Sequence, residues 1–208
     1  MKVGKIGQCD PVTAPLRGGN VLALARPVLL ENPVIRRLGA HVGKRIYFGY
    51  DRYIAPTVST YRDALSAFGT VLDAVDEHEL HYLSSAELVC TAVRADPDSF
   101  GILCCGTGMG MSIAANKFRD IYAARCMTVE DAEMARTINN ANVLCIAART
   151  ELAINTAIIS AFANTAYTGR KLEELERITQ FETAETPPLR AVPAASRYVV
   201  LDVVRRTA

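Results

Sequence analysis

Several residue types are scarce in this chain of 208 residues, which has no tryptophan, only three histidines and a formal net charge of +1. Balanced, scattered charge provides no extended basic surface of the kind that binds nucleic acid or an anionic membrane. No uninterrupted apolar run approaches the roughly 20 residues that a membrane-spanning helix requires. We therefore expect a globular protein whose partners are small molecules or other subunits, with no nucleic acid and no membrane among them.

Cysteine is present, but in a pattern that excludes two common kinds of site. The six cysteines lie mostly inside apolar, strand-like runs, at positions 9, 90, 104, 105, 126 and 145. Their spacing matches neither a zinc site nor a small disulfide-bonded scaffold. Residues 1–19 also lack the apolar core of a secretion signal. These features predict a cytoplasmic protein with reduced thiols and no bound metal.

Half of the residues are hydrophobic, and short apolar runs alternate with helix-like segments. Runs typical of buried strands occupy residues 45–50, 70–75, 101–105, 121–126 and 142–148. Segments typical of helices lie at 57–68, from an N-cap at Ser84 or Ser85 to about 96, at 128–137, at 151–166 and at 169–177. This alternation predicts an α/β fold, a Rossmann-like three-layer sandwich with a five-stranded parallel sheet covered on both faces.

The two ends of the chain depart from this alternation. Residues 1–43 contain prolines at positions 11, 15, 27 and 33, which interrupt any helical period. We interpret this stretch as an N-terminal arm that packs on the domain or on a neighbouring subunit, with a disordered extension as the alternative. The Rossmann-like domain is expected at residues 44–180 and a C-terminal tail at residues 181–208.

The most informative stretch is Gly101–Phe118, in which an apolar strand ends on Cys104 and Cys105 and a glycine-rich turn follows. Three glycines within residues 106–110 leave the backbone unshielded, so that successive N–H groups can converge on an anion. The positive end of the following helix would add to this attraction. Because Cys105 is the last strand residue before the turn, its thiolate would be a nucleophile or a base beside developing negative charge.

Other interpretations of this stretch remain open. A strand, a glycine-rich turn and a helix also occur as a purely structural connection in proteins that bind no ligand there. A dinucleotide fingerprint would need a third glycine where Met111 stands, and a P-loop would need Gly-Lys-Ser/Thr. Cys104 is interpreted as a small buried hydrophobic residue that faces the opposite side of the strand from Cys105.

A second feature supports a site at the same place. Ligands of parallel α/β sheets bind at the carboxyl ends of the strands. Asp51 follows the first predicted strand, and Cys105 with its glycine turn ends the third. These groups are therefore expected to meet at one edge of the sheet.

The segments ILCCGTGMGMSIAANKF and NNANVLCIAAR, together with their flanks, resemble the family of ribose-5-phosphate isomerase B and galactose-6-phosphate isomerase. The resemblance extends over residues 45 to about 170. It implies a Rossmann-like enzyme without metal or cofactor that moves a proton between C1 and C2 of a phosphorylated sugar through an enediolate. It also implies a homodimer or tetramer whose active sites are shared between subunits.

The resemblance assigns roles to individual residues on the strand ends of one chain. Cys105 corresponds to the base that removes the C2 proton, with Thr107 beside it as a second catalytic residue. The enediolate oxygen would be held by backbone amides of the turn, from Gly106, Gly108, Met109 and Gly110, with Ser112 lining the same hollow. Substrate would be bound by Asp51, by Arg52 as a holder of phosphate, and by Tyr82.

Three further substrate-binding residues are implied to come from the partner subunit. Asn139 corresponds to an asparagine that contacts the sugar, while Arg149 and Arg170 resemble arginines that bind the phosphate. Arginine suits that role because its planar fork donates two parallel hydrogen bonds.

The chain departs from the family pattern at two positions. Arg52 stands where family members commonly have a histidine, and Ile138 stands where the family has the histidine that opens the furanose ring. The substrate is therefore either already open-chain, such as a tetrose 4-phosphate, or the histidine comes from a different polypeptide in a hetero-oligomer. Two alternatives of other classes are a non-catalytic subunit that binds sugar phosphate and a dinucleotide-dependent oxidoreductase.

Overall fold

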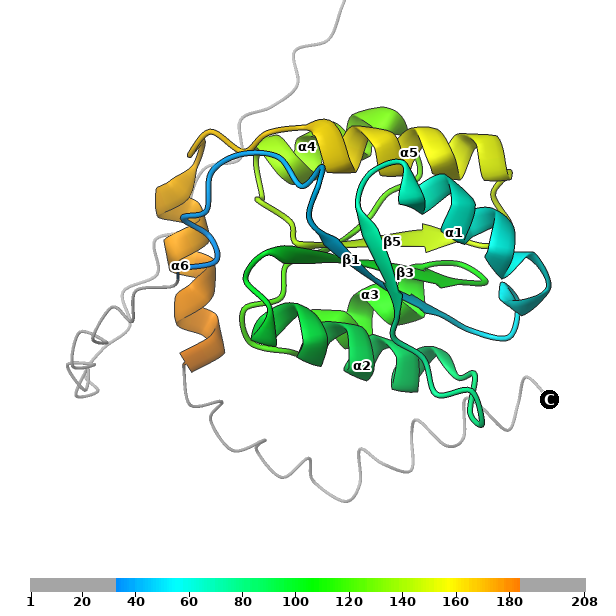
Figure 1. The fold of residues 1–208 in the computed structure, drawn as a ribbon. Helices are drawn as coiled ribbons and strands as arrows, with labels where there is room; N and C mark the ends of the chain where they lie inside the picture. Colours follow the sequence, from blue (N-terminus) through cyan, green and yellow to red (C-terminus); the bar gives the residue numbers. More distant parts are fainter. Residues whose placement is uncertain (1–32, 184–208) are drawn as a thin grey trace, which may run out of the picture. The chain divides into compact units, whose positions relative to one another are not determined.

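The computed structural model describes residues 33–183. Its centre is a single sheet of five parallel strands in the order β2-β1-β3-β5-β4 (Figure 1). The strands are β1 (Arg45–Tyr50), β2 (Thr70–Asp73), β3 (Ser99–Cys105), β4 (Ala123–Arg125) and β5 (Val143–Ala147). The predicted α/β fold with a five-stranded parallel sheet is therefore confirmed.

Helices cover both faces of the sheet and form the outer two layers (Figure 1). One face carries α1 (Val58–Ser66), α4 (Val129–Thr137) and α5 (Leu152–Asn164). The other face carries α2 (Tyr82–Ala95) and α3 (Met109–Ala115), and a short 3-10 turn at Ala55–Thr57 precedes α1. The last helix, α6 (Leu172–Thr183), lies beside the sheet rather than on either face. Within residues 33–183, no helix combines the length and apolarity that are needed to cross a bilayer.

The central strand β3 is buried along its whole length and divides the core in two. Cys104 belongs to the cluster that packs under α1 and α5, whereas Cys105 belongs to the cluster under α2 and α3. Alternation of side chains along a strand produces this separation. The prediction that Cys104 is a buried residue facing away from Cys105 is confirmed.

Two glycines allow α2 to lie close to the sheet. A Cβ atom added at Gly49 or at Gly101 would come within 2.6 Å of the side chain of Val89. Such a contact is far below a van der Waals distance, so any larger residue would push α2 outward. The close approach matters for the site because Tyr82, the first residue of α2, lies at the carboxyl edge of the sheet.

The predicted N-cap of α2 is wrong. The helix begins at Tyr82, and His81 is the cap, with its Nδ1 atom accepting a hydrogen bond from the Leu83 amide at 3.3 Å. Ser84 and Ser85 lie inside the helix, where Ser85 is fully buried and donates from Oγ to the Tyr50 carbonyl at 2.7 Å. Ser85, one of the two serines predicted as a cap, therefore connects α2 to the end of β1 instead.

Helix α6 is also shifted from its predicted position at residues 169–177. Gly169 and Lys171 have φ angles of +90° and +58°, values outside the right-handed helical region, so the helix begins only at Leu172. It continues to Thr183 and thus crosses the predicted boundary between domain and tail at residue 180. The remainder of the predicted tail, residues 184–208, lies outside the described residues.

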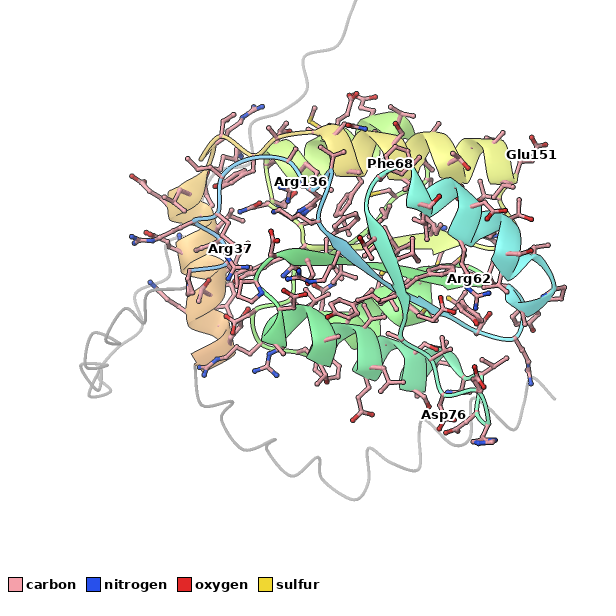
Figure 2. All side chains as sticks on the ribbon, viewed as in Figure 1. Arg37, Arg62, Phe68, Asp76, Arg136 and Glu151 are labelled. Carbon is pink, nitrogen blue, oxygen red and sulfur yellow. The ribbon has the colours of Figure 1, made fainter. Side chains whose placement is uncertain are left out.

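Residues 34–44 pack on the domain through buried polar contacts, at the end of the sheet where Figure 2 labels Arg37 and Arg136. Asn140 donates from Nδ2 to the carbonyls of Val34 and Ile35, and Arg136 donates to the Gly39 carbonyl at 3.0 Å. Gly39 also forms an isolated antiparallel bridge with Tyr167. This part of the predicted arm therefore belongs to the core of the fold, while residues 1–32 lie outside the described part of the chain.

Candidate active site

An open cleft of about 620 Å³ lies at the carboxyl edge of the sheet, where β1, β3 and β5 end. Its lining comes from the loop after β1, from the start of α2, from the glycine turn and from the residues that follow β5. These residues are Asp51, Tyr53, Tyr82, Cys105, Gly106, Thr107, Gly110, Ala148 and Arg149. The predicted convergence of Asp51, Cys105 and the glycine turn on one edge is confirmed.

Cys105 lies at the floor of the cleft, with 5% of its surface exposed. Its Sγ atom accepts a hydrogen bond from the Gly108 amide at 3.2 Å. Gly108 itself has a φ of +72°, in the left-handed region that favours glycine. The turn that follows Cys105 thus contacts its sulfur directly and holds it at the cleft.

The remaining amides of the turn are available to a ligand. Within residues 33–183, the amides of Gly106, Thr107 and Gly110 donate no hydrogen bond. All three residues line the cleft. Unpaired backbone N–H groups that border one cavity can together donate hydrogen bonds to an anion, as in other glycine-rich turns before a helix.

The glycine turn is held from behind by a residue that sequence reasoning missed. Arg125, at the end of edge strand β4, donates from Nε to the Thr107 carbonyl at 2.8 Å. One terminal nitrogen of this guanidinium is buried without a partner among the described residues. Thr107 also accepts a hydrogen bond from the Met109 amide on its Oγ1 atom, at 3.3 Å. The only signal in the sequence was an arginine inside an otherwise apolar run.

Asp51 is positioned by the backbone around it and is 6% exposed. Its amide donates to the Cys104 carbonyl at 3.2 Å, which continues the pairing of β1 with β3 beyond the strand end. Its Oδ1 atom accepts a hydrogen bond from the Tyr53 amide at 3.0 Å. These contacts keep the carboxylate at the wall of the cleft.

Two tyrosines border the glycine turn, and only one of them was predicted. A Cβ atom added at Gly110 would lie 2.9 Å from the ring of Tyr82, so the absence of a side chain at this position lets the ring lie against the turn. At the other end of the turn, the ring of Tyr53 lies over Gly106, 3.6 Å from where a Cβ would be. Sequence reasoning missed Tyr53, which is 64% exposed and has the guanidinium of Arg52 over its ring at 5.7 Å.

The other described cysteines have the properties of core residues. Burial raises the pKa of Cys90 and of Cys126 to about 12, and it also raises the pKa of Cys104 and Cys145 above the ordinary thiol range. A thiol with such a pKa stays protonated at neutral pH and is neither a base nor a nucleophile.

Several predicted substrate-binding residues do not line the cleft of the same chain. Arg52, Gly108, Met109 and Ser112 are close to it in sequence, but they are not part of its wall. The amides of Gly108 and Met109, predicted to hold the enediolate oxygen, instead donate to Cys105 Sγ and Thr107 Oγ1. Asn139 lines a separate cavity of about 470 Å³ beside edge strand β4. Arg170 is exposed in the segment just before α6.

This arrangement can be compared with known proteins. The ribose-5-phosphate isomerase B of Mycobacterium tuberculosis is 31% identical over 164 residues, which cover 73% of this chain and 99% of that protein. The 4-deoxy-4-sulfo-D-erythrose isomerase of a Clostridium species is 43% identical over 63 residues, or 30% of this chain and 40% of that protein. The chain spans only 24% and 50% of the lengths of two further relatives, from Arabidopsis thaliana and Mycoplasma pneumoniae.

Solved structures and a family model agree with these relatives. The type B ribose 5-phosphate isomerase of Leishmania infantum aligns with a TM-score of 0.62 at 35% sequence identity, over 68% of this chain and 97% of that chain. Residues 48–180 match the model of the family described as Ribose/Galactose Isomerase. Because this match includes both the glycine turn and the strands around the cleft, the chain belongs to the ribose/galactose isomerase family.

Proposed function

We propose that this protein interconverts an aldose and a ketose that carry a phosphate group, by moving a proton between C1 and C2 through an enediolate. The observation that carries the proposal is the pairing of Cys105 with the glycine turn. The sulfur lies at the floor of the cleft and accepts a hydrogen bond from the Gly108 amide at 3.2 Å. Unpaired amides border the same cleft.

The chemistry follows from these positions. The thiolate of Cys105 removes the C2 proton of the aldose, and the resulting thiol returns a proton to C1. The hydroxyl proton passes from O2 to O1 of the enediolate, so that C1 becomes the alcohol carbon and C2 the carbonyl carbon. Negative charge develops on the carbonyl oxygen in the transition state. Preorganised amides of Gly106, Thr107 and Gly110 would stabilise that charge, at about 3 to 4 kcal/mol for each donor. The carboxylate of Asp51 is placed to accept hydrogen bonds from sugar hydroxyls.

The phosphate is assigned to the outer part of the cleft. Arg149, for which the resemblance implies a place on the partner subunit, lies at the rim of the cleft of its own chain, exposed and two residues beyond the end of β5. An exposed guanidinium can receive a phosphate in a bidentate manner without first being desolvated. The remaining family positions, Asn139 and Arg170, lie outside the cleft of their own chain, so we propose that a second subunit supplies them in a cytoplasmic homodimer or larger assembly.

The proposed substrate has four carbons and an open chain. Ile138 cannot exchange a proton with a ring oxygen, so a substrate that exists as a furanose would lack the group that opens it. A tetrose 4-phosphate cannot close a furanose ring because its O4 atom carries the phosphate. The similar Clostridium protein is named for a four-carbon sugar with a sulfo group at C4, which lacks a free hydroxyl at that carbon in the same way.

The test is proton exchange measured by NMR in D₂O. The purified chain is incubated with aldose and ketose phosphates of four, five and six carbons, and deuterium at C1 or C2 is recorded. We expect exchange on the four-carbon substrates and its loss in Cys105→Ser, with binding of the sugar phosphate retained. Cys104→Ser is the matched control, because this neighbouring thiol faces the opposite core.

Each other outcome points to a different function. Strong exchange on ribose 5-phosphate with none on four-carbon substrates would contradict the proposed substrate length. Binding of sugar phosphates without any exchange would favour a non-catalytic subunit. Activity that appears only after a second polypeptide is added would favour a hetero-oligomer in which that polypeptide carries the histidine.

A further inference from the structure

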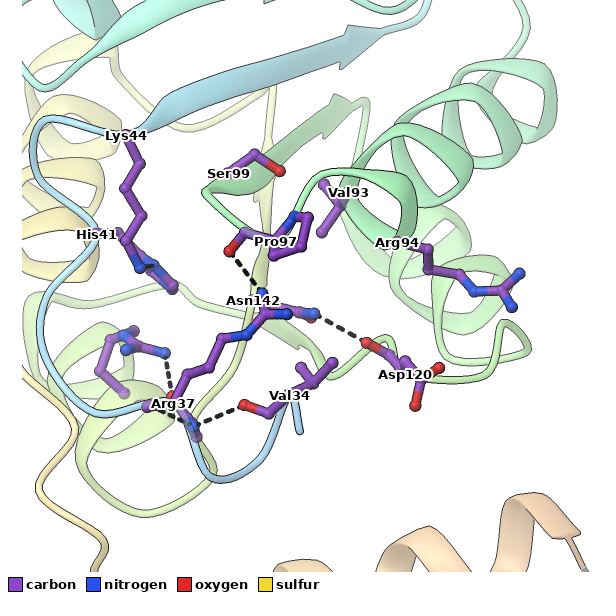
Figure 3. Close-up of a pocket in the computed structure, with 12 residues that line it drawn as sticks. Val34, Arg37, His41, Lys44, Val93, Arg94, Pro97, Ser99, Asp120 and Asn142 are labelled. Atoms are coloured by element: carbon purple, nitrogen blue, oxygen red, sulfur yellow. Dashed lines mark hydrogen bonds between the residues drawn. The ribbon is translucent and has the colours of Figure 1, made fainter. Parts of the chain in front are cut away.

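A second cavity lies at the amino edge of the sheet, at the opposite ends of the strands from the cleft (Figure 3). It is closed on one side by residues 34–44 and on the other by the starts of β3 and β5. Its volume of about 30 Å³, against about 620 Å³ for the cleft, leaves space for a small ion or a few water molecules. A sugar phosphate does not fit this space.

The lining of this basic cavity is dominated by positive charge. Arg37, Lys44, Arg94 and Arg136 contribute cationic side chains, and Asp120 contributes the one carboxylate of the lining. Figure 3 shows Arg94 extending away from Arg37 and Lys44, so three cations remain around the hollow. Among residues 33–183, none of these three forms a salt bridge.

The most deeply placed of these cations is Arg136, which is 1% exposed. It donates hydrogen bonds to Asn140 Oδ1 at 2.9 Å, to the Ala141 carbonyl at 2.6 Å and to the Gly39 carbonyl at 3.0 Å. All of these acceptors are neutral. Hydrogen bonds to neutral groups satisfy the N–H donors, but they leave a full positive charge in a poorly solvated place.

The other cations retain unused donors. The Lys44 ammonium lies 3.5 Å from Nδ1 of His41, whose Nε2 atom is 3.1 Å from the Ala141 carbonyl. With the ring proton on Nε2, the Nδ1 atom of His41 accepts a hydrogen bond from the Lys44 ammonium. This contact occupies one of the three N–H donors of Lys44. Arg37 donates from one terminal nitrogen to the Pro97 carbonyl at 2.5 Å. The rest of both groups can serve a bound ligand.

The titration behaviour of the cavity agrees with an excess of positive charge. The pKa of Lys44 is lowered by burial first and then by the charge of Arg136. Burial is also the main cause that lowers the pKa of Arg136 to about 10 and the pKa of His41 well below its usual value. The charges of Arg136 and Arg37 lower the pKa of Lys44, while Asp98 raises it. A bound anion would offset the burial of these cations and the repulsion at Lys44.

From this arrangement we propose that the basic cavity binds a small inorganic anion between Lys44 and Arg37, above the buried guanidinium of Arg136. Because Arg37, His41 and Lys44 all belong to the segment before β1, the anion links this segment to α4 and to the start of β5. The site is separate from the cleft and is expected to affect stability rather than turnover.

The test is the effect of anions on thermal unfolding of the full chain at constant ionic strength. Sodium gluconate is replaced stepwise by sodium chloride or, in a parallel series, by sodium phosphate. We expect the melting midpoint to rise with the concentration of one of these anions, as for any ligand that binds only the folded state. The two series distinguish a halide from a tetraoxo anion.

Variants connect the effect to the cavity. In Lys44→Met, anion affinity should fall by about tenfold or more, since one charge-assisted hydrogen bond is lost. Lys117→Met, which removes an exposed lysine on the surface next to α3, is the matched control and should respond like the unmodified protein. If Lys44→Met does not fold, Arg37→Gln with titration calorimetry of chloride and phosphate replaces it.

Two results would overturn the proposal. One is a melting midpoint that is the same in gluconate, chloride and phosphate at equal ionic strength. The other is an anion response in Lys44→Met, or in Arg37→Gln, that equals the response of the unmodified protein.

Discussion

The Nε atom of Arg125 donates a hydrogen bond to the carbonyl oxygen of Thr107 at 2.8 Å, and this contact joins edge strand β4 to the glycine turn. β4 reaches the turn across β5, because the order of the sheet is β3-β5-β4 on this side. The hydrogen bond holds the Thr107 carbonyl against the Arg125 guanidinium. Removing this hydrogen bond tests how far the conformation of the glycine turn depends on Arg125.

Arg125→Met should lower kcat on the substrate identified by proton exchange by about tenfold, equivalent to about 1.4 kcal/mol of transition-state stabilisation. The physical reason is a looser turn, whose amides no longer point at one position. KM should change less, because the phosphate is assigned to a different part of the cleft. Arg125→Lys should recover part of the activity, since an ammonium can reach the same carbonyl. Equal activity of Arg125→Met and the unmodified protein would show that the turn holds its shape unaided.

Gly108→Ala should lower the free energy of unfolding by about 1 to 3 kcal/mol, the cost of placing a residue with a Cβ in the left-handed region. The added carbon would also lie 3.0 Å from the Ile146 carbonyl oxygen. Urea denaturation measures the change. Gly106→Ala is the matched control, because its Cβ would have no neighbour closer than 3.6 Å and its φ is not positive. A stability loss in Gly106→Ala as large as that in Gly108→Ala would contradict this explanation.

Tyr53→Ala should raise the ratio of kcat/KM for five-carbon over four-carbon sugar phosphates. The ring of Tyr53 covers Gly106 and so occupies part of the cleft above the proposed anion site. Removing the ring lengthens the cleft. A side chain that fills part of a binding site limits the size of the substrate that fits. Tyr53→Phe keeps the ring and should keep the ratio. An unchanged ratio in Tyr53→Ala would mean that the ring does not limit substrate length.

His41 should make stability depend on pH in the mildly acidic range. Burial, with the charge of Arg136 as the next cause, lowers its pKa in the folded protein well below 6.5. Below about pH 6.5 the unfolded chain therefore binds a proton that the folded chain does not, and the free energy of unfolding falls as the pH falls. The slope contributed by this group cannot exceed about 1.4 kcal/mol per pH unit.

Urea denaturation between about pH 8 and pH 5 measures this dependence, since histidine titrates in that interval. His41→Gln should flatten the profile, because glutamine keeps a hydrogen-bond donor for the Ala141 carbonyl but does not titrate. His78→Gln, an exposed histidine in the loop before α2, should leave the profile unchanged. Parallel profiles for the unmodified protein and His41→Gln would refute the assignment.

Much of the candidate site followed from local chemistry. The strand that ends in Cys104 and Cys105, the opposite facing of these two side chains, and the position of the glycine turn beside the cleft could be predicted from alternation and glycine spacing alone. The cap of α2 could not, because Ser84 and Ser85 have the composition of a cap. Whether a serine caps a helix or forms another hydrogen bond depends on which acceptor the fold brings near it. The Ser85 hydroxyl donates to the Tyr50 carbonyl.

Residue order along the chain was thus enough to indicate a parallel sheet, the edge at which the cleft lies and the sulfur at that edge. The reason is that side-chain periodicity and turn preferences act over a few residues. Folding in three dimensions decided which distant groups meet. It brought Arg125 behind Thr107, placed Tyr53 over Gly106, left Asn139 outside the cleft, and gathered Arg37, Lys44 and Arg136 around one small cavity. Such contacts depend on strand order and helix packing, which no short stretch of sequence encodes.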